Sequence, residues 1–166
     1  TQQSMSMGVA LEKMLYGMGA PHKVKLAVSG CPRNCAEAGI KDVGVIGVDS
    51  GWEIYVAGNG GIKTEVAQFL CKVKTREEVL ETTGAFIQLY REEARYLDRT
   101  VHWLGRVGLD RVKRRVVDDA EGRRIASQMA GADVLFMASH GLTVVGPTVA
   151  WAFDDLYYLE RACMHQ

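Results

Sequence analysis

The 166-residue chain carries 20 basic and 20 acidic side chains, and 48% of its residues are hydrophobic. That size and apolar content suit one ordinary globular domain or two small ones, and a formal net charge of zero argues against broad electrostatic binding to nucleic acid or to a membrane surface. No apolar run reaches the roughly 18 residues of a membrane span, and the first residues lack a charged leader, so we expect a cytoplasmic protein.

The first part of the chain predicts a helix, a strand and a cysteine-containing loop. Apolar residues at helical spacing over 5–18 predict a short helix. The stretch HKVKLAVSG, residues 22–30, alternates in polarity, so we expect a strand with Lys23 and Lys25 projecting from one face. Cys31 and Cys35 then lie on the loop after this strand.

The next segments indicate a hairpin and a glycine-rich turn. Two β-rich runs, 43–49 and 52–58, are joined at a Ser-Gly pair, which is typical of a β-hairpin. The following GNGGIK, residues 58–63, is expected to be a turn because its glycines adopt conformations closed to other residues.

Helical patterns follow the turn. Residues 64–73 carry apolar side chains at helical spacing, which predicts a helix with Cys71 facing the core. Thr75 stands three residues before Glu78, the arrangement of a capping box, and predicts the start of a second helix. A third helix, interrupted at a glycine, is expected over 100–119.

The character of the sequence changes near residue 130. From there it predicts a strand, a histidine-glycine turn, a second strand and an amphipathic helix. The helix has an apolar stripe expected to face the core, made of Phe153, Leu156, Tyr157 and Leu159. We therefore predict an α+β fold, with a mixed or antiparallel sheet covered by helices on one side and a C-terminal β-turn-β-α appendage. The expected boundary separates residues 1–125 from 126–166.

The cysteine pair has several possible chemistries. In a reducing compartment free thiols or metal ligands are expected rather than disulfides, and thiolates bind iron–sulfur clusters and soft metals. Two cysteines alone are equally consistent with inert thiols on a packed loop. A zinc site fits less well because no second pair of cysteines or histidines stands at finger spacing.

The lysine pair is open to two interpretations. Lys23 and Lys25 place two positive charges near the thiols along the chain, which favours an anionic substrate that gains negative charge during its reaction. The alternative is a solvent-facing strand that the lysines protect from aggregation. Spacing alone leaves both open.

Three segments of the chain resemble the sulfite and nitrite reductase sirohaem superfamily. They are residues 21–63 (PHKVKLAVSGCPRNCAEAGIKDVGVIGVDSGWEIYVAGNGGIK), the stretch LCKVKTREEVLE and residues 84–119. Within this superfamily, residues 1–125 look like the C-terminal part of the large subunit of assimilatory NAD(P)H nitrite reductases. The resemblance implies a 4Fe-4S cluster held by Cys31, Cys35 and an upstream cysteine pair, with Cys35 bridging the cluster to sirohaem.

The same resemblance assigns further roles. It implies that Lys23 and Lys25 face the substrate nitrite, and that Asn59 and Gly60 lie in a turn close to the cofactors. In such enzymes nitrite takes six electrons to become ammonia. The upstream cysteine pair is absent from this sequence, so we expect a fragment that lacks the upstream half of its reductase, retains no cofactor alone and is inactive alone.

The tail, residues 131–166, instead resembles the C-terminal end of class II aldolase and adducin proteins, on the strength of SHGLTVVGPTVAWAFDDLYYLERA. This resemblance implies that His140 is a divalent-metal ligand, although one histidine does not define a site and an ordinary turn residue is the alternative. The functional alternatives are therefore a metal-dependent aldolase-like lyase and a catalytically inert fusion product.

Overall fold

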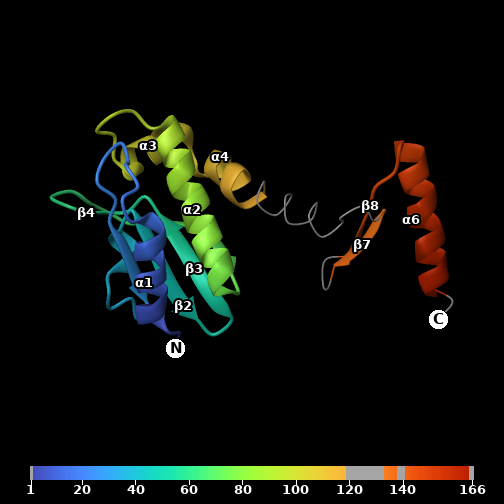
Figure 1. Cartoon of the computed structure of the whole chain (residues 1–166), viewed down its shortest axis with the longest axis horizontal. Coiled ribbons are helices and arrows are strands. Elements are labelled where there is room, and N and C mark those ends of the chain that lie inside the picture. Colours follow the sequence, from blue (N-terminus) through green and yellow to red (C-terminus); the bar gives the residue numbers. More distant parts are fainter. Residues whose placement is uncertain (1, 119–132, 138–140, 165–166) are drawn as a thin grey trace. The chain divides into compact units, whose positions relative to one another are not determined.

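The computed structural model describes residues 2–118, 133–137 and 141–164 (Figure 1). The chain divides into two units, Thr1–Ala120 and Glu121–Gln166, which are described separately below. Within the described ranges, no helix combines the length and the apolar character needed to cross a membrane.

A four-stranded sheet forms the centre of the first unit. Its strands are β1 (Leu26–Ser29), β2 (Val43–Val48), β3 (Gly51–Val56) and β6 (Gln68–Val73), in the order β1-β2-β3-β6. β1 pairs with β2 in parallel, and the other two pairings are antiparallel. The sheet is therefore mixed, and the predicted α+β class and the predicted β2–β3 hairpin are confirmed.

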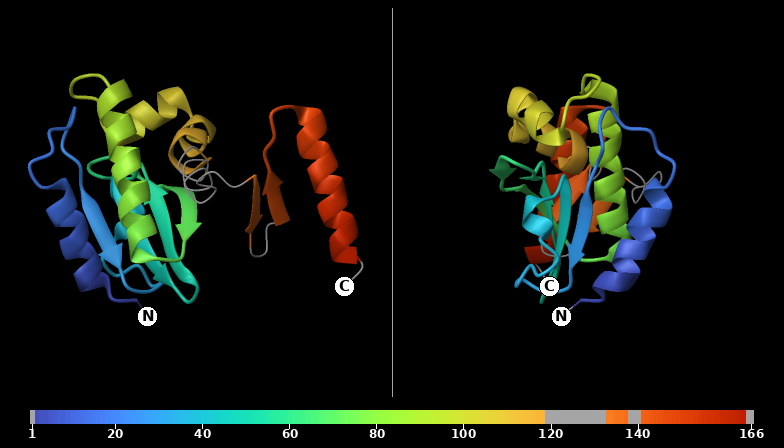
Figure 2. Two further views of the ribbon diagram at one scale, coloured as in Figure 1. Left: turned by 45° about the vertical axis from the view of Figure 1, so that its right-hand side comes forward. Right: turned by 90° about the vertical axis from the view of Figure 1, so that its left-hand side faces the viewer.

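Two helices cover one face of this sheet, α1 (Ser4–Leu15) and α2 (Arg76–Glu93) (Figure 2). α2 begins with the predicted capping box, since the side chains and N–H groups of Thr75 and Glu78 bond reciprocally. One core cluster between helices and sheet joins Met7, Leu11, Val45, Trp52 and Val79. Burying each such side chain stabilises the fold by roughly 1.5–3 kcal/mol.

The larger core cluster joins the sheet to the second half of the helical region. α3 (Thr100–Val107) and α4 (Leu109–Lys113) are separated at Gly108 and followed by the π-helical turn Arg114–Asp118. The break at a glycine agrees with the sequence. The largest buried side chains of this cluster include Phe86, Tyr90 and Trp103, and the Trp103 ring contacts the rings of both Phe86 and Tyr90.

The opposite face of the sheet carries a short 3₁₀ helix, η1 (Ala38–Ile40). It lies so close to β2 that a Cβ on Gly44 would meet the carbonyl oxygen of Ala38 at 2.0 Å. Only glycine fits at this point of β2. A two-stranded hairpin, β4 (Asn59–Gly60) and β5 (Thr64–Glu65), extends from the end of β3.

The predicted helix at 64–73 is wrong, because this segment forms β5 and β6. The β3–β6 pairing shifts register between Ile54 and Tyr55, which pair with Cys71 and Phe69 respectively. Leu70 is left between the two pairs and is 2% exposed. This irregularity places neighbouring apolar residues in the core and removes the simple alternation that identifies a strand.

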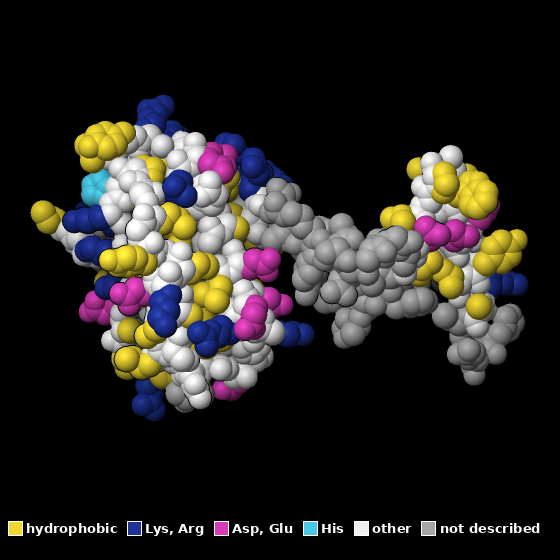
Figure 3. Space-filling view, in the orientation of Figure 1, with side chains coloured by type: hydrophobic (Ala, Val, Ile, Leu, Met, Phe, Trp, Pro, Cys, Tyr) yellow, Lys and Arg dark blue, Asp and Glu magenta, His cyan; other side chains and the backbone are white. Residues whose placement is uncertain are grey.

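In the second unit, β7 (Val134–Met137) and β8 (Gly141–Val144) form an antiparallel pair and are followed by α6 (Val149–Met164). The predicted strand-strand-helix order is confirmed, whereas His140 lies outside the described residues. The predicted core-facing stripe is wrong for Phe153, Leu156 and Tyr157, which are 65%, 39% and 46% exposed. Figure 3 shows hydrophobic side chains at the surface of this unit.

Candidate functional site

Cys31 and Cys35 lie on the loop between β1 and η1, as the sequence predicts. The loop is built around Asn34, whose backbone is left-handed with a φ of 55°. The N–H of Asn34 donates to the carbonyl oxygen of Cys31 at 3.1 Å. The side-chain oxygen of Asn34 accepts from the Ser29 hydroxyl at 3.2 Å and from the N–H of Gly39 at 3.3 Å. Asn34 therefore fixes the loop to both β1 and η1.

The two thiols differ in exposure. Both cysteines are free, with Cys31 half-buried and Cys35 exposed. Cys31 borders a pocket of about 480 Å³, together with Arg33, Val48 and Asp49. β1 and β2 are parallel, so the residues that follow both strands meet at this edge of the sheet. The loop thus presents one thiol to a pocket and the other to solvent.

The beginning of the described chain lies beside the same loop. The N–H of Gln2 donates to the carbonyl oxygen of Gly30 at 2.7 Å. The side-chain amide of Gln2 donates to the carbonyl oxygen of Val48, a lining residue of the pocket, at 3.0 Å. A segment joined ahead of Gln2 would therefore start next to Cys31.

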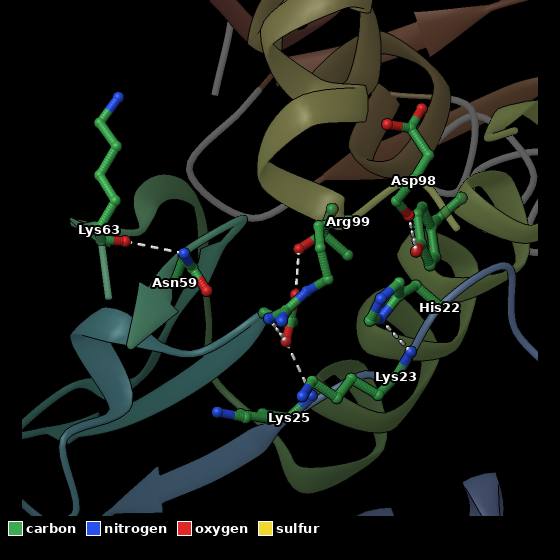
Figure 4. Close-up of polar contacts among 10 residues, drawn as sticks. His22, Lys23, Lys25, Asn59, Lys63, Asp98 and Arg99 are labelled. Atoms are coloured by element: carbon green, nitrogen blue, oxygen red, sulfur yellow. Dashed lines mark hydrogen bonds and ion pairs between the residues drawn. The ribbon is translucent and has the colours of Figure 1, made fainter. Parts of the chain in front are cut away.

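The lysine pair lies just before β1, not within it. The strand begins at Leu26, so the predicted start at residue 22 is wrong. Lys23 and Lys25 are both exposed, and Val24 between them is half-buried against the larger core. Figure 4 shows both lysine side chains extending to the same side.

The predicted glycine-rich turn forms the β4–β5 hairpin. The side-chain amide of Asn59 donates to the carbonyl oxygen of Lys63 at 2.8 Å and closes the turn (Figure 4). Gly60 packs close to Ile40, since a Cβ on it would lie 3.2 Å from the Ile40 Cδ1. The turn is therefore held against the end of η1.

Strand directions place these features at two different edges. β1 and β2 begin where the antiparallel β3 ends, so the lysines and the Asn59 turn belong to one edge of the sheet. Cys31 follows the other end of β1. Lys25 stands six positions before Cys31, a separation of about 20 Å at most along an extended strand. The structure brings the lysines together with the turn and leaves Cys31 at the opposite edge.

Sequence reasoning missed a buried charge at the lysine edge. Asp42 is 0% exposed and accepts from the N–H of Lys25 at 2.9 Å and from the Arg99 guanidinium at 2.8 Å. The Thr100 hydroxyl donates to the other oxygen of the carboxylate. The sequence around Asp42 could not indicate this role, because Arg99 and Thr100 lie more than fifty residues later in the chain.

Cys71 is separate from the cysteine loop. It lies on β6, packs against the larger core, and burial raises the pKa of its thiol to about 11. β2 and β3 lie between its strand and β1. Among the residues that the structure describes, no three His, Cys, Asp or Glu side chains are grouped to hold a metal ion. Cys31 and Cys35 therefore make an incomplete ligand set for a cluster that needs four thiolates.

Two protein-family models match the chain. The model for the nitrite and sulphite reductase 4Fe-4S domain matches residues 2–124, and the model for the class II aldolase and adducin N-terminal domain matches residues 86–166. Both cover residues 86–124. In the structure, Phe86, Tyr90 and Trp103 of the overlap are buried in the core of the first unit.

The curated relatives that match the first 120 or so residues include nitrite reductases. The chain is 60% identical over 124 residues to the NAD(P)H nitrite reductase of Bacillus subtilis (strain 168), a match that covers 75% of this chain and 15% of that protein. It is 41% identical over 121 residues to the NADH nitrite reductase large subunit of Escherichia coli (strain K12), covering 72% of this chain and 14% of that protein. The chain thus spans only a small part of these relatives.

Among solved structures, the Mycobacterium tuberculosis NirA protein matches with a TM-score of 0.51 and 21% identity, over 65% of this chain and 22% of that chain. At this identity the likeness supports the fold of the first unit and carries no assignment of activity.

Proposed function

Because the chain belongs to the nitrite and sulphite reductase 4Fe-4S domain family, we propose that residues 1–125 are one part of a sirohaem-containing nitrite reductase of the cytoplasm. The observation that carries the proposal is the cysteine loop, which holds two free thiols around Asn34, one of them beside a pocket. The tail, residues 126–166, is a separate class II aldolase-like segment in this proposal.

In the proposed role, Cys31 and Cys35 would supply two of the four thiolate ligands of a 4Fe-4S cluster, and Cys35 would also link the cluster to the sirohaem. Each iron of such a cluster takes its own terminal ligand. The described residues supply two thiolates at the loop and none from Cys71, whose thiol faces the core. The described residues alone do not fit a complete cluster, so in this proposal a second segment provides the other pair of thiolates.

Lys23 and Lys25 have a separate proposed role as positive charges that face nitrite. Reduction of nitrite to ammonium takes six electrons and eight protons and releases two waters. Wherever an electron arrives before its proton, negative charge builds up transiently on the bound nitrogen oxide. Fixed ammonium groups lower the cost of that charge. Asn59 and Gly60 are proposed to lie against the cofactors. Lys25 stands six positions before Cys31 and Lys23 eight positions before it, which corresponds to at most about 20 Å and about 26 Å of extended chain, so the two roles need separate tests.

The proposal is tested by grafting residues 2–124 in place of the matching stretch of the Bacillus subtilis relative. The graft should reduce nitrite with reduced viologen as electron donor. Cys31→Ser and Cys35→Ser should each abolish turnover and lower bound iron, because each removes a cluster thiolate. Cys71→Ser is the matched control and should leave both unchanged. Full turnover in Cys35→Ser would contradict the proposal.

The lysine role is measured in the same graft. Lys23→Ala and Lys25→Ala should each raise the KM for nitrite by about tenfold, as expected for loss of one charge near a bound anion. Lys13→Ala removes an exposed charge from α1 and serves as the control. An unchanged KM in both lysine variants, with iron retained, would remove the lysines from the proposal while leaving the thiolate role in place.

The aldolase-like match supports a second candidate, a metal-dependent lyase activity of the tail. The proposed ligand is His140, which lies outside the described residues, and those residues contain no group of three or more His, Cys, Asp or Glu side chains that could hold a metal ion. Because one imidazole does not define a site, we expect His140→Ala to leave the zinc content of the purified chain unchanged. Stoichiometric zinc that disappears in the variant would favour the lyase.

A further inference from the structure

The lysine edge of the sheet is organised around a carboxylate that has no contact with solvent. Asp42 is 0% exposed, and burying a charged group is costly unless it is paired and fully hydrogen-bonded. Its two oxygens accept from the Lys25 N–H, the Arg99 guanidinium and the Thr100 hydroxyl. These donors come from the segment before β1 and from the start of α3.

The backbone of Asp42 makes a further connection. Its carbonyl oxygen accepts from the N–H of Ala57 at 2.8 Å, and the carbonyl oxygen of Lys41 accepts from the N–H of Gly58 at 2.9 Å. Ala57 and Gly58 lead directly into β4, which contains Asn59. One residue therefore contacts the lysine segment, the beginning of α3 and the chain that enters the glycine-rich turn.

We propose that Asp42 is a positioning residue that holds the Lys23–Lys25 segment and the Asn59 turn in a fixed arrangement at this edge. Only the expected effect of Asp42 on the KM for nitrite rests on the proposed function, whereas its structural role does not. The N–H of Lys25 donates to the Asp42 carboxylate at 2.9 Å, while its carbonyl oxygen accepts from the N–H of Val43 in β2 at 3.1 Å. The Asp42 side chain therefore holds the donor side of Lys25, and β2 holds the acceptor side.

Arg99 shows why the carboxylate cannot be replaced by a neutral group without a structural effect. The Arg99 side chain is 14% exposed, and its Nε is buried without a hydrogen-bond partner. Arg99 forms an ion pair with the Asp42 carboxylate at 2.8 Å. An asparagine at 42 offers only one acceptor oxygen to three donors and leaves a buried guanidinium without its counter-charge.

The positioning role is tested first in the isolated chain, by hydrogen exchange of single amides. In Asp42→Asn the Lys25 amide should exchange at least about tenfold faster, as expected for loss of a charge-assisted hydrogen bond. Amides of the β2–β3 pairing should keep their rates, which shows that the sheet persists. Unchanged exchange at Lys25 would overturn the inference, whatever the function of the protein.

Thr100→Val is the milder variant if Asp42→Asn fails to fold. It removes one donor to Asp42 and preserves side-chain shape, so Lys25 exchange should rise by a smaller factor, roughly threefold. The matched control is Glu93→Gln, which breaks the Arg111 ion pair between α2 and α4, 2.8 Å in length. It should leave Lys25 exchange unchanged, and a Thr100→Val chain with parental exchange would contradict the inference.

The catalytic consequence is measured in the Bacillus graft. Asp42→Asn should raise the KM for nitrite by about tenfold or more with bound iron retained, because displacement of a binding group by about 1 Å has effects of this size. Glu93→Gln should not. If Lys23→Ala and Lys25→Ala do not change the KM, the lysine role fails. If they do and Asp42→Asn does not, the positioning role fails.

Discussion

Cys71 lies against the core of the first unit, and burial is the main cause that raises the pKa of its thiol to about 11. At pH 8 such a thiol is about one part in a thousand thiolate, and the thiolate is the reactive form. Cys35, in contrast, is exposed.

The chain should therefore show ordered alkylation. With iodoacetamide at pH 8, peptides that contain Cys31 and Cys35 should be modified well before the peptide that contains Cys71, as read by mass spectrometry. Denaturation should make Cys31, Cys35 and Cys71 react alike. Modification of Cys71 in the folded chain at the rate of Cys35 would show that the thiol does not face the core.

Asp98 provides an acid-sensitive contact at the start of α3. Its carboxylate accepts from the Arg106 guanidinium at 2.6 Å, and this hydrogen bond is the main cause that lowers the pKa of Asp98. A lowered folded-state pKa contributes stability that is complete above the ordinary value and is lost as pH falls through the lowered one.

Arg106→Gln should accordingly lower the free energy of unfolding at pH 7. The difference from the parent should shrink as the pH falls below the ordinary range for aspartate, and disappear below the lowered pKa of Asp98. Urea unfolding at a series of pH values measures this, with Arg95→Gln as the control. A difference that persists unchanged into strong acid would exclude the Asp98 contact as its source.

At the residue scale, sequence identified exposed groups better than buried ones. Cys31 and Cys35 lie on the loop after β1, as the sequence predicts, and Lys23 and Lys25 are exposed, whereas the chemical roles of these four residues stay predictions. Asp42 was not predictable, because its meaning depends on Arg99 and Thr100, which the fold brings to it. The predicted strand start failed for the same reason, since the Lys25 N–H bonds to Asp42.

At the element scale, two glycines of the helical region have opposite requirements. Gly108, between α3 and α4, has a φ of +85°, whereas Gly105 lies inside α3, and a Cβ on either would meet no atom within 4 Å. An alanine methyl group would therefore clash with nothing at either glycine, and the two positions differ only in backbone conformation.

Alanine substitutions at these sites should change stability in opposite directions. Gly108→Ala should lower the free energy of unfolding by about 1–2 kcal/mol, because alanine is strained at positive φ. Gly105→Ala should raise it by up to about 1 kcal/mol, since alanine favours a helix. Chemical unfolding measures the free energy of unfolding of each variant. If Gly105→Ala destabilised the chain as much as Gly108→Ala, the boundary between α3 and α4 would not lie at Gly108.

Elements with regular patterns were predictable, and β6 and α6 show the limits. The apolar residues of 64–73 fit helical spacing, and a register shift in β6 hid the strand alternation. In α6 the apolar stripe is real in the sequence, but Phe153 and Tyr157 are exposed within the described part of the second unit. Periodicity predicts that a helix is amphipathic and does not say what covers it.

At the scale of the whole chain, the two family matches overlap, and the packing of residues 86–118 shows to which structural unit the shared residues belong. Val112 and Val116 are 0% and 1% exposed in the same core cluster as Val43 and Ile54 of the sheet. The start of the aldolase-like match is thus part of the first unit.

Truncations test this assignment. Residues 1–120 alone should unfold at the same urea midpoint as the first unit of the full chain, because both core clusters lie within them. Truncation after Val107 should cost about 3–6 kcal/mol, since it removes two buried valines. Unfolding of the 1–120 chain at a much lower midpoint would show that the tail contributes to the fold of the first unit.

In the proposed function, Cys31 and Cys35 form half of a cluster site that a second pair of thiolates completes. The most direct measurement is iron bound per chain after anaerobic reconstitution with iron and sulfide, made side by side on the isolated chain and the Bacillus graft. Counted apart from any sirohaem iron, we expect about four irons in the graft, the content of a 4Fe-4S cluster, far fewer in its Cys35→Ser variant, and no stable four-iron cluster in the isolated chain. Four irons in the isolated chain, or in the Cys35→Ser graft, would contradict the account.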